Sequence, residues 1–503
     1  MPFWRWPLNP GFQLLNIRLE FLNLIFDCLN IAHHWFPFVA TKSAPGAEDF
    51  KANSLFVTEL DVDGSPGRRR KTSLAKGVQR RPRGWQYASR IHPACGRRCR
   101  LTKSEEKETI ISMRPIPIGQ IAATTISPND DNTWTEVAPS AAGMKVDRLE
   151  QVTDWLASRL SDRHFGAQLV VLRGGRVVLD RSVGFTNRDH SRVTPRDRFV
   201  VYSLGKPFAA LCVHLLAERG LLALDKPVSV YWPEYGQHGK QDVTVRQVLQ
   251  HRTGSPMAGR GMLGVLAETF AMPNWAKSIR RIEEATPWFA PGSAPAYQFF
   301  SYGFICGELV CRVTGKKIQE FFDENFARPL GLTRTSFGLP RSAWGERVVI
   351  HGKAAFLFNW RRMREAVCPS ATTSTTAREV AVFYEMLRCG GCAGSARLLG
   401  EGTILAAREP SSDGEVDRFI KAPVRWSQAF MLGGVSSDED LGRIMGRKSS
   451  RETFGCGGSS CCVAWCDPSR ELVAVYLCNK SVPDPIGFAQ LLDLSDLILD
   501  SCE

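Results

Sequence analysis

The chain has 503 residues, of which 44% are apolar and 23% are charged, and its formal net charge is +13. This composition is typical of a globular protein with a sizeable core, and the length allows two or three domains, or one large domain behind a long tail. No uncharged apolar run reaches the roughly 18 residues of a membrane span, so the sequence does not predict a transmembrane protein.

The first predicted element is an apolar stretch over residues 11–40. Charges at Arg18, Glu20 and Asp27 interrupt it, and it has neither the basic start nor the small-residue cleavage site of a signal peptide. We interpret it as an amphipathic helix or as a helix that a partner covers, and an organellar leader remains an alternative.

A basic segment follows over residues 65–104. It contains thirteen Lys and Arg and no Asp or Glu, which by itself matches the excess of positive charge. Such a segment could contact nucleic acid or an anionic membrane. We favour a solvated, disordered linker because few of its residues can form a core. Residues 1–144 are therefore predicted to be an N-terminal tail that is largely disordered.

From residue 145 onward the sequence predicts regular elements. Apolar residues at helical spacing predict a helix over 146–160, and two strand-like runs around Gly174-Gly175 predict a hairpin over 167–185. A buried helix is expected to begin near Pro207 and to end near Gly220. A long region of helices and loops then extends to about residue 390.

The end of the chain returns to strands. Apolar runs predict strands over 425–434, 461–468 and 471–479, and residues 486–502 predict a closing helix. Strands, then helices, then strands and a helix favour an α+β fold in which one antiparallel sheet is assembled from both ends of the domain and flanked by helices. We therefore expect one domain over 145–503.

Fifteen cysteines are present. Several fall on apolar helical or strand-like patterns, as is typical of cysteine used as a small hydrophobic residue in a reducing compartment. Two groups of cysteines are candidate zinc ligands, Cys389 with Cys392, and Cys456 with Cys461, Cys462 and Cys466. They lack the paired C-x-x-C spacing of structural zinc sites. We expect no metal, no cofactor and an intracellular location, either cytoplasmic or organellar.

Three S-x-x-K quartets occur, at Ser73, Ser104 and Ser203. The first two lie in the basic tail, where no apolar element could hold a serine and a lysine in fixed geometry. Ser203 lies between an apolar run and a strongly apolar helix, and Lys206 would share its helical face within hydrogen-bond reach. Because Pro207 disfavours helical geometry in the residue before it, we expect a tight turn at Lys206.

A serine hydroxyl attacks efficiently only if a nearby base takes its proton. Lysine can be that base only where burial lowers its pKa from about 10.4 towards neutrality. Taken alone, the quartet at Ser203 favours the simpler interpretation, a serine that caps the helix beside a lysine in solvent.

Several segments, in order along residues 145–503, resemble the serine beta-lactamase and penicillin-binding-protein superfamily, in its class C and esterase-like branch. They are SLGKPFAALCVHLLAERG, VTVRQVLQHRTGSP, PGSAPAYQFFSYGF and FGCGGSSCCVAWCDP. The resemblance implies a beta-lactamase/transpeptidase-like fold with a helical subdomain.

The resemblance also implies roles for single residues. Ser203 would form the acyl-enzyme, Lys206 would be its partner, and Tyr297 would help to move the proton. As a general base, Tyr297 would need a pKa below its usual value, which neighbouring Lys206 could supply. The backbone amides of Ser203 and Ser459 would form the oxyanion hole. His251 would be a structural, hydrogen-bonded core residue.

Two positions depart from the family pattern. The second motif usually ends in asparagine, but Phe299 stands there. The third motif usually begins with lysine or histidine, but here it is Cys456-Gly457-Gly458. A neutral thiol leaves both the binding of a substrate carboxylate and the lowering of the Lys206 pKa in doubt, whereas the glycines would still let a substrate approach the strand.

We therefore expect a serine hydrolase or acyltransferase that forms an acyl-enzyme at Ser203 with a small-molecule ester or amide. An esterase is favoured over an antibiotic-resistance lactamase because of Phe299 and Cys456. The alternative is a catalytically impaired pseudoenzyme that uses the fold as a scaffold or self-assembling module, and Cys456 is the feature that favours it.

Overall fold

The computed structural model describes residues 126–503, apart from 132, 161–164, 188–190, 353–354, 436, 483 and 503. The apolar stretch 11–40, the basic segment 65–104 and the quartets at Ser73 and Ser104 lie outside the described residues. The interpretations given above for these segments and quartets stay predictions.

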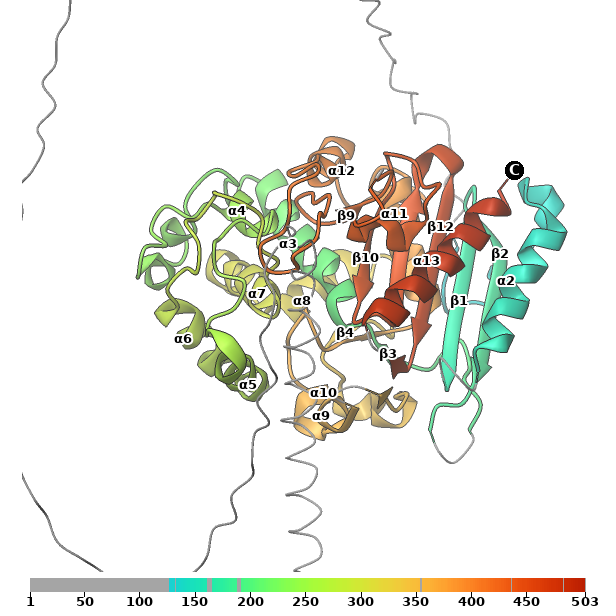
Figure 1. Ribbon diagram of the computed structural model, residues 1–503, viewed down its shortest axis with the longest axis horizontal. Helices are drawn as coiled ribbons and strands as arrows, with labels where there is room; N and C mark the ends of the chain where they lie inside the picture. The colour runs from blue at the N-terminus through green and yellow to red at the C-terminus, as the bar shows by residue number, and fades with distance from the viewer. Residues whose placement is uncertain are drawn as a thin grey trace, which may run out of the picture. The chain divides into compact units, whose positions relative to one another are not determined.

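A six-stranded antiparallel sheet is the main β element (Figure 1), and its strand order is β2-β1-β12-β11-β10-β9. Its strands are β1 (Gly166–Arg173), β2 (Arg176–Gly184), β9 (Met431–Leu432), β10 (Phe454–Gly458), β11 (Cys462–Asp467) and β12 (Leu472–Cys478). In the pairing of β1 with β12, Ala167 lies opposite Cys478. The sheet is thus assembled from both ends of the domain, and this prediction is confirmed.

Among the described residues, seven short strands form smaller sheets. They are β3 (Phe199–Val200), β6 (Thr373–Thr375) and β4 (Ser336–Phe337); β13 (Lys480–Ser481) and β5 (His351–Gly352); and β7 (Cys392–Ala393) and β8 (Ala396–Arg397). The β3-β6-β4 sheet matters most for function, because β3 leads directly into Ser203.

Helices flank the large sheet and also form a group beside it (Figure 1). At the sheet, α2 (Val146–Ser158) packs against α13 (Asp484–Asp500), and α11 (Ala377–Arg388) contacts β1, β11 and β12. The neighbouring group contains α3 (Lys206–Glu218), α4 (Val245–Leu249), α5 (Gly261–Ala271), α6 (Trp275–Glu284), α7 (Ser301–Thr314) and α8 (Ile318–Phe322). Shorter helices are α9 (Ala355–Asn359), α10 (Arg361–Arg364) and α12 (Glu401–Arg408). The expected α+β fold with a helical subdomain is confirmed.

Two predicted elements show how local sequence sets this architecture. Gly174 and Gly175 have φ of 56° and 73°, so they form the tight β1–β2 turn that only glycine adopts without strain. Every side chain of α3 from Lys206 to Leu216 is buried. A helix that is apolar all round belongs inside a domain, and α3 indeed packs against α7, α8 and α12.

The start of α3 differs from the expectation. Lys206 is helical, with φ of −62° and ψ of −45°, and the tight turn is the 3-10 helix η2 (Tyr202–Gly205) directly before it. Pro207 is accommodated because the first amides of a helix need no intrahelical partner. Lys206 therefore belongs to a rigid helical turn.

Residues 126–144 lie on the tail side of the expected boundary at 145, yet they pack against the domain. Trp134 is 5% exposed and its Nε1 donates a hydrogen bond to Asp180 at 2.7 Å. The amide of Val137 donates to the carbonyl of Val177 in β2 at 2.9 Å. The domain boundary itself stays a prediction.

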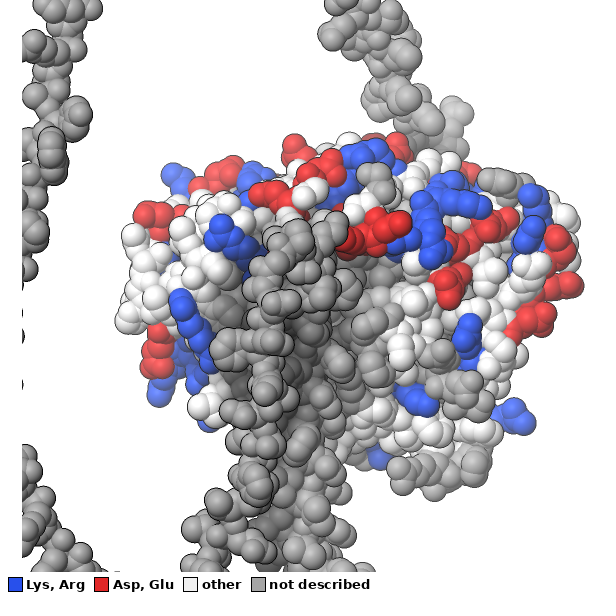
Figure 2. Space-filling view, viewed as in Figure 1, with Lys and Arg blue, Asp and Glu red and all other residues white. Residues whose placement is uncertain are grey.

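Lys and Arg alternate with Asp and Glu over the coloured part of the surface in Figure 2, so neither sign forms a large field on that face. Within the described residues, no helix combines the length and the apolar character that crossing a membrane would require.

Candidate active site

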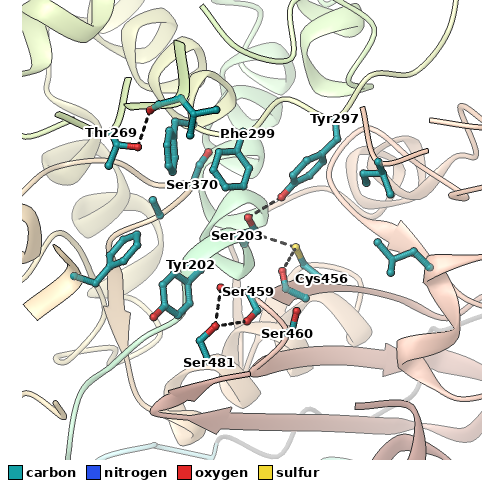
Figure 3. Close-up of a pocket in the computed structure, with 18 of the residues that line it drawn as sticks. Tyr202, Ser203, Thr269, Tyr297, Phe299, Ser370, Cys456, Ser459, Ser460 and Ser481 are labelled. Carbon is teal, nitrogen blue, oxygen red and sulfur yellow. Dashed lines mark hydrogen bonds between the residues drawn. The ribbon is translucent and has the colours of Figure 1, made fainter. Parts of the chain in front are cut away.

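Three side chains from two distant parts of the chain meet at the N-terminus of α3, and Figure 3 shows two of them, Ser203 and Tyr297. Lys206 Nζ lies 3.0 Å from Ser203 Oγ and 2.8 Å from the hydroxyl of Tyr297. The Tyr297 hydroxyl in turn donates to Ser203 Oγ at 2.6 Å. All three distances are within hydrogen-bond range, so a proton can pass between any two of these groups. The three side chains that the sequence grouped are together in space.

The backbone around Ser203 is held in an unusual shape. Tyr202, directly before it, has a φ of 49°, which costs a bulky residue on the order of 1 kcal/mol or more. The Tyr202 ring packs edge-on against Phe358 at 5.1 Å. On the other side, a Cβ on Gly205 would overlap the carbonyl oxygen of Pro369 and the hydroxyl of Thr373. Packing on both sides therefore fixes the turn that carries Ser203.

Lys206 is only 2% exposed. Burial disfavours the charged ammonium and lowers the pKa of Lys206 to about 7. The sequence left in doubt whether the pKa of Lys206 could fall without a cationic residue at position 456. Burial alone is sufficient to lower it. A substantial neutral fraction of Lys206 is therefore available near pH 7 to accept a proton.

Tyr297 does not have the lowered pKa that the sequence led us to expect. Burial raises the pKa of the phenol well above its usual value, because desolvation outweighs the stabilisation that the hydrogen bond with Ser203 gives to the phenolate. Tyr297 is therefore protonated at neutral pH. In this state it can relay a proton, whereas Lys206 is the group that can act as the base.

Asp417 supports Tyr297 and was not identified from the sequence. Its carboxylate accepts hydrogen bonds from the amide of Tyr297 at 2.9 Å and from the indole of Trp426 at 3.1 Å. Trp426 stacks on Tyr297 with ring centroids 5.4 Å apart and an interplanar angle of 9°. Asp417 thus holds both the backbone of Tyr297 and the ring on which its phenol lies.

His251 is a structural residue, as the sequence predicted. It is 4% exposed, and its Nδ1 accepts a hydrogen bond from the amide of Gln298 at 3.2 Å. Burial lowers the pKa of His251 well below its usual value, so the ring is neutral. Its contacts with Tyr297 and Trp426 help to position the segment that carries the phenol.

Strand β10 passes directly beside the turn that carries Ser203. The thiol of Cys456 donates to the carbonyl of Ser203 at 3.2 Å, and burial raises the pKa of this thiol to about 12, so it is uncharged. A Cβ on Gly458 would overlap the carbonyl oxygen of Val201. Gly458 therefore admits the neighbouring backbone, and both Gly457 and Gly458 line the cavity, as expected of glycines that a substrate approaches.

The turn after β10 presents Ser459 to the same region. Ser459 and Ser460 have φ of 48° and 57°, a strained pair that closes the β10–β11 hairpin through a hydrogen bond from the amide of Cys461 to the carbonyl of Gly458 at 3.1 Å. Ser481 Oγ lies 3.4 Å from Ser459 Oγ, as Figure 3 shows. Among the hydrogen bonds of the described chain, none has the amide of Ser203 or of Ser459 as its donor. Both amides thus remain available to a ligand.

A cavity of about 200 Å³ opens over Ser203. Its lining is mostly aromatic and aliphatic, and the polar side chains among it include Ser203, Tyr297, Cys456 and Ser459. Phe299 lines it at the position where the family has asparagine, and packs against Phe300 at 4.3 Å. The site can therefore bind an apolar molecule and present its carbonyl group to a serine.

In the part of the chain that the structure describes, no three His, Cys, Asp or Glu side chains are grouped in a way that could hold a metal ion. The twelve described cysteines carry free thiols, and most of them are buried.

Comparison with known proteins connects this geometry to a family. The model of the Beta-lactamase family matches residues 146–493. The esterase/beta-lactamase LipL of Mycobacterium tuberculosis is 26% identical over 368 residues, which cover 66% of this chain and 81% of LipL.

Two solved structures are similar over nearly their whole length. A penicillin-binding-protein homologue from Caulobacter crescentus has a TM-score of 0.61 and 26% identity, covering 71% of this chain and 99% of its own. A family VIII carboxylesterase has a TM-score of 0.60 and 27% identity, covering 70% of this chain and 98% of its own.

Proposed function

Because the chain belongs to the Beta-lactamase family, we propose that it cleaves an ester, or transfers its acyl group, through an acyl-enzyme on Ser203. The chain is a serine hydrolase of the esterase-like kind, and its relatives give the pseudoenzyme alternative no support. The observation that carries the proposed site is the closed triangle of Ser203, Lys206 and Tyr297, with the pKa of Lys206 lowered to about 7.

In the first half of the reaction, neutral Lys206 takes the proton of the Ser203 hydroxyl while the Ser203 oxygen attacks the ester carbonyl. The amides of Ser203 and Ser459 stabilise the negative charge that develops on the carbonyl oxygen. Tyr297 then donates its proton to the departing alcohol and regains one from Lys206. The alcohol leaves, and the acyl group stays on Ser203 as an ester.

In the second half, a water molecule or a second alcohol attacks this ester. The attacking hydroxyl gives its proton to the Lys206–Tyr297 pair, and Ser203 recovers its proton as the acyl group departs. Water gives hydrolysis and an alcohol gives acyl transfer, so the same residues serve both reactions.

An active-serine reagent tests this proposal directly. The full-length chain is incubated with a fluorophosphonate and its intact mass is measured. We expect one adduct on the wild type and none on Ser203→Ala. The other two S-x-x-K serines provide matched controls, and Ser73→Ala and Ser104→Ala should both keep the adduct.

Absence of an adduct on a folded wild type would overturn the proposal and favour the scaffold alternative. An adduct that persists on Ser203→Ala would place the nucleophile elsewhere.

A further inference from the structure

The wall of the cavity over Ser203 is free of charge. Among the described residues that line it, none is Asp, Glu, Lys, Arg or His. The polar lining groups are hydroxyls and one thiol, and Cys456, where the family has a cation, is neutral. Away from Lys206, whose amine lies 3.0 Å from Ser203 Oγ, a charged group on a bound molecule would therefore lose its water without gaining an ionic partner, which is costly.

Apolar side chains of the cavity come from two separate groups of elements. One group belongs to α5 and α9 and includes Leu266, Phe270 and Leu357. The other belongs to β9 and to the 3-10 helix η7 (Leu441–Met445) and includes Met431 and Leu441. Helices α5 and α9 lie well apart from β9 in Figure 1, and Figure 3 shows apolar side chains on both sides of Ser203.

An ester bound at Ser203 has two halves, the acyl chain and the alcohol, which extend in different directions from the carbonyl carbon. We propose that this site takes an uncharged ester whose acyl chain and alcohol are both apolar, with one half against the α5–α9 group and the other against the β9–η7 group. The proposal deepens the function given above and rests on acylation of Ser203.

The size of the effect follows from burial. Each methylene that leaves water for an apolar wall improves binding by up to about fourfold. Because the wall continues beyond the reacting carbonyl on both sides, lengthening either half of the ester should raise kcat/KM until the corresponding group of side chains is covered.

Two series of substrates test this on the full-length chain. In the first, the acyl chain of a p-nitrophenyl ester is lengthened from acetate to decanoate. In the second, the alcohol of an acetate ester is lengthened from ethyl to octyl. We expect kcat/KM to rise by about tenfold or more along each series, and to fall by about tenfold or more when a terminal carboxylate replaces the end of a chain of equal length.

Two charged variants separate the halves. Leu266 and Leu441 are both half-buried, so an arginine at either position can reach solvent. Leu266→Arg should flatten one series and improve the carboxylate-ended esters of that series, and Leu441→Arg should do the same for the other series. Leu263→Arg is the matched control, because Leu263 lies one turn from Leu266 on α5, is 77% exposed and does not line the cavity.

Fluorophosphonate labelling of every variant separates two claims, that Ser203 is acylated and that the cavity takes an ester with two apolar halves. If Ser203 is labelled but kcat/KM is flat along either series, or carboxylate-ended esters react equally well, the apolar assignment is overturned while acylation of Ser203 stands. If both variants change the same series, the assignment of two sides is overturned. If the wild type is not labelled, the proposed function itself fails.

Discussion

Burial removes water from the amine of Lys206, and the pKa of this group falls to about 7. Below this pH the amine is protonated and cannot take the proton of Ser203; above it, the neutral base predominates. We expect kcat/KM for an uncharged ester to rise by about tenfold per pH unit on the acidic side and to level off above about pH 7. A pH–rate profile measures this.

Lys206→Arg provides the comparison for this profile. Arginine keeps its charge at all accessible pH values, so the variant should be slow and should lack the rise near pH 7. A wild-type profile that is flat from about pH 5 to 8 would contradict the assignment of Lys206 as the base.

A second prediction concerns Asp417. Its carboxylate accepts bonds from the amides of Tyr297, Phe419 and Ile420 and from the indole of Trp426. Asp417→Asn turns one acceptor into a donor that faces these N–H groups. We expect a loss of about 1–3 kcal/mol in stability, measured by urea unfolding, and a fall in kcat larger than the change in KM.

Asp225→Asn is the matched control, because Asp225 forms an exposed pair with Arg246 and should change stability by less than about 1 kcal/mol. Equal kcat for wild type and Asp417→Asn would contradict a positioning role for Asp417.

At the level of single residues, the motifs and their order along the chain, which is that of the family, were enough to group Ser203, Lys206 and Tyr297. They could not identify Asp417, because it lies 120 residues from Tyr297 in a loop without a distinctive pattern. They also gave the wrong direction for the Tyr297 pKa. The sequence gives no measure of how deeply the phenol is buried, and desolvation is the largest cause of its raised pKa.

Among elements, the 3-10 helix η2 depends on Gly205. A Cβ at this position would overlap backbone and side-chain atoms of Pro369 and Thr373. Gly205→Ala should therefore lower stability by about 1–3 kcal/mol or more and displace Ser203, reducing activity further than stability alone explains. Thermal melting and ester hydrolysis measure the two effects.

Gly402→Ala is the control, because Gly402 lies in α12 and has nothing within 4 Å of its would-be Cβ. Alanine there should stabilise by about 0.5–1 kcal/mol. A Gly205→Ala variant that is as stable and as active as the wild type would show that the turn has room to adjust.

The elements that could be predicted are those with strong periodicity, such as the β1–β2 hairpin, α3, β12 and α13. The run 425–434 was predicted as one strand, but only Met431–Leu432 pair in the sheet. Ser427 explains the difference, because its amide bonds to the carbonyl of Phe430 and closes a turn inside the run. Such local competition between a turn and a strand is not visible in an apolar pattern.

At the scale of the whole molecule, we expect the stability of the domain to depend on residues that precede the predicted boundary at 145. Trp134, Met144 and Ile126 are 5%, 3% and 9% exposed. A chain of residues 145–503 loses these contacts and should be less stable than a chain of residues 126–503 by about 3 kcal/mol or more. Urea unfolding of the two chains measures the difference, and equal stability would support the boundary at 145.

Contact of the basic segment 65–104 with nucleic acid or an anionic membrane stays a prediction from charge. No sequence pattern predicted which ester enters the cavity over Ser203. The apolar walls of this cavity come from α5, α9, β9 and η7, which are far apart along the chain.

Gly458 of β10 lies close beside the carbonyl of Val201, so the turn that carries Ser203 reaches its final surroundings only after β10 has been synthesised. Ser203 and Lys206 leave the ribosome long before β10, β11 and β12, and β1 cannot complete its pairing with β12 until Cys478 has been translated. Pairing between such distant segments is a slow step in folding. A nascent or prematurely terminated chain therefore carries the serine and its base without the amide of Ser459, and it should leave cellular esters intact until synthesis is complete.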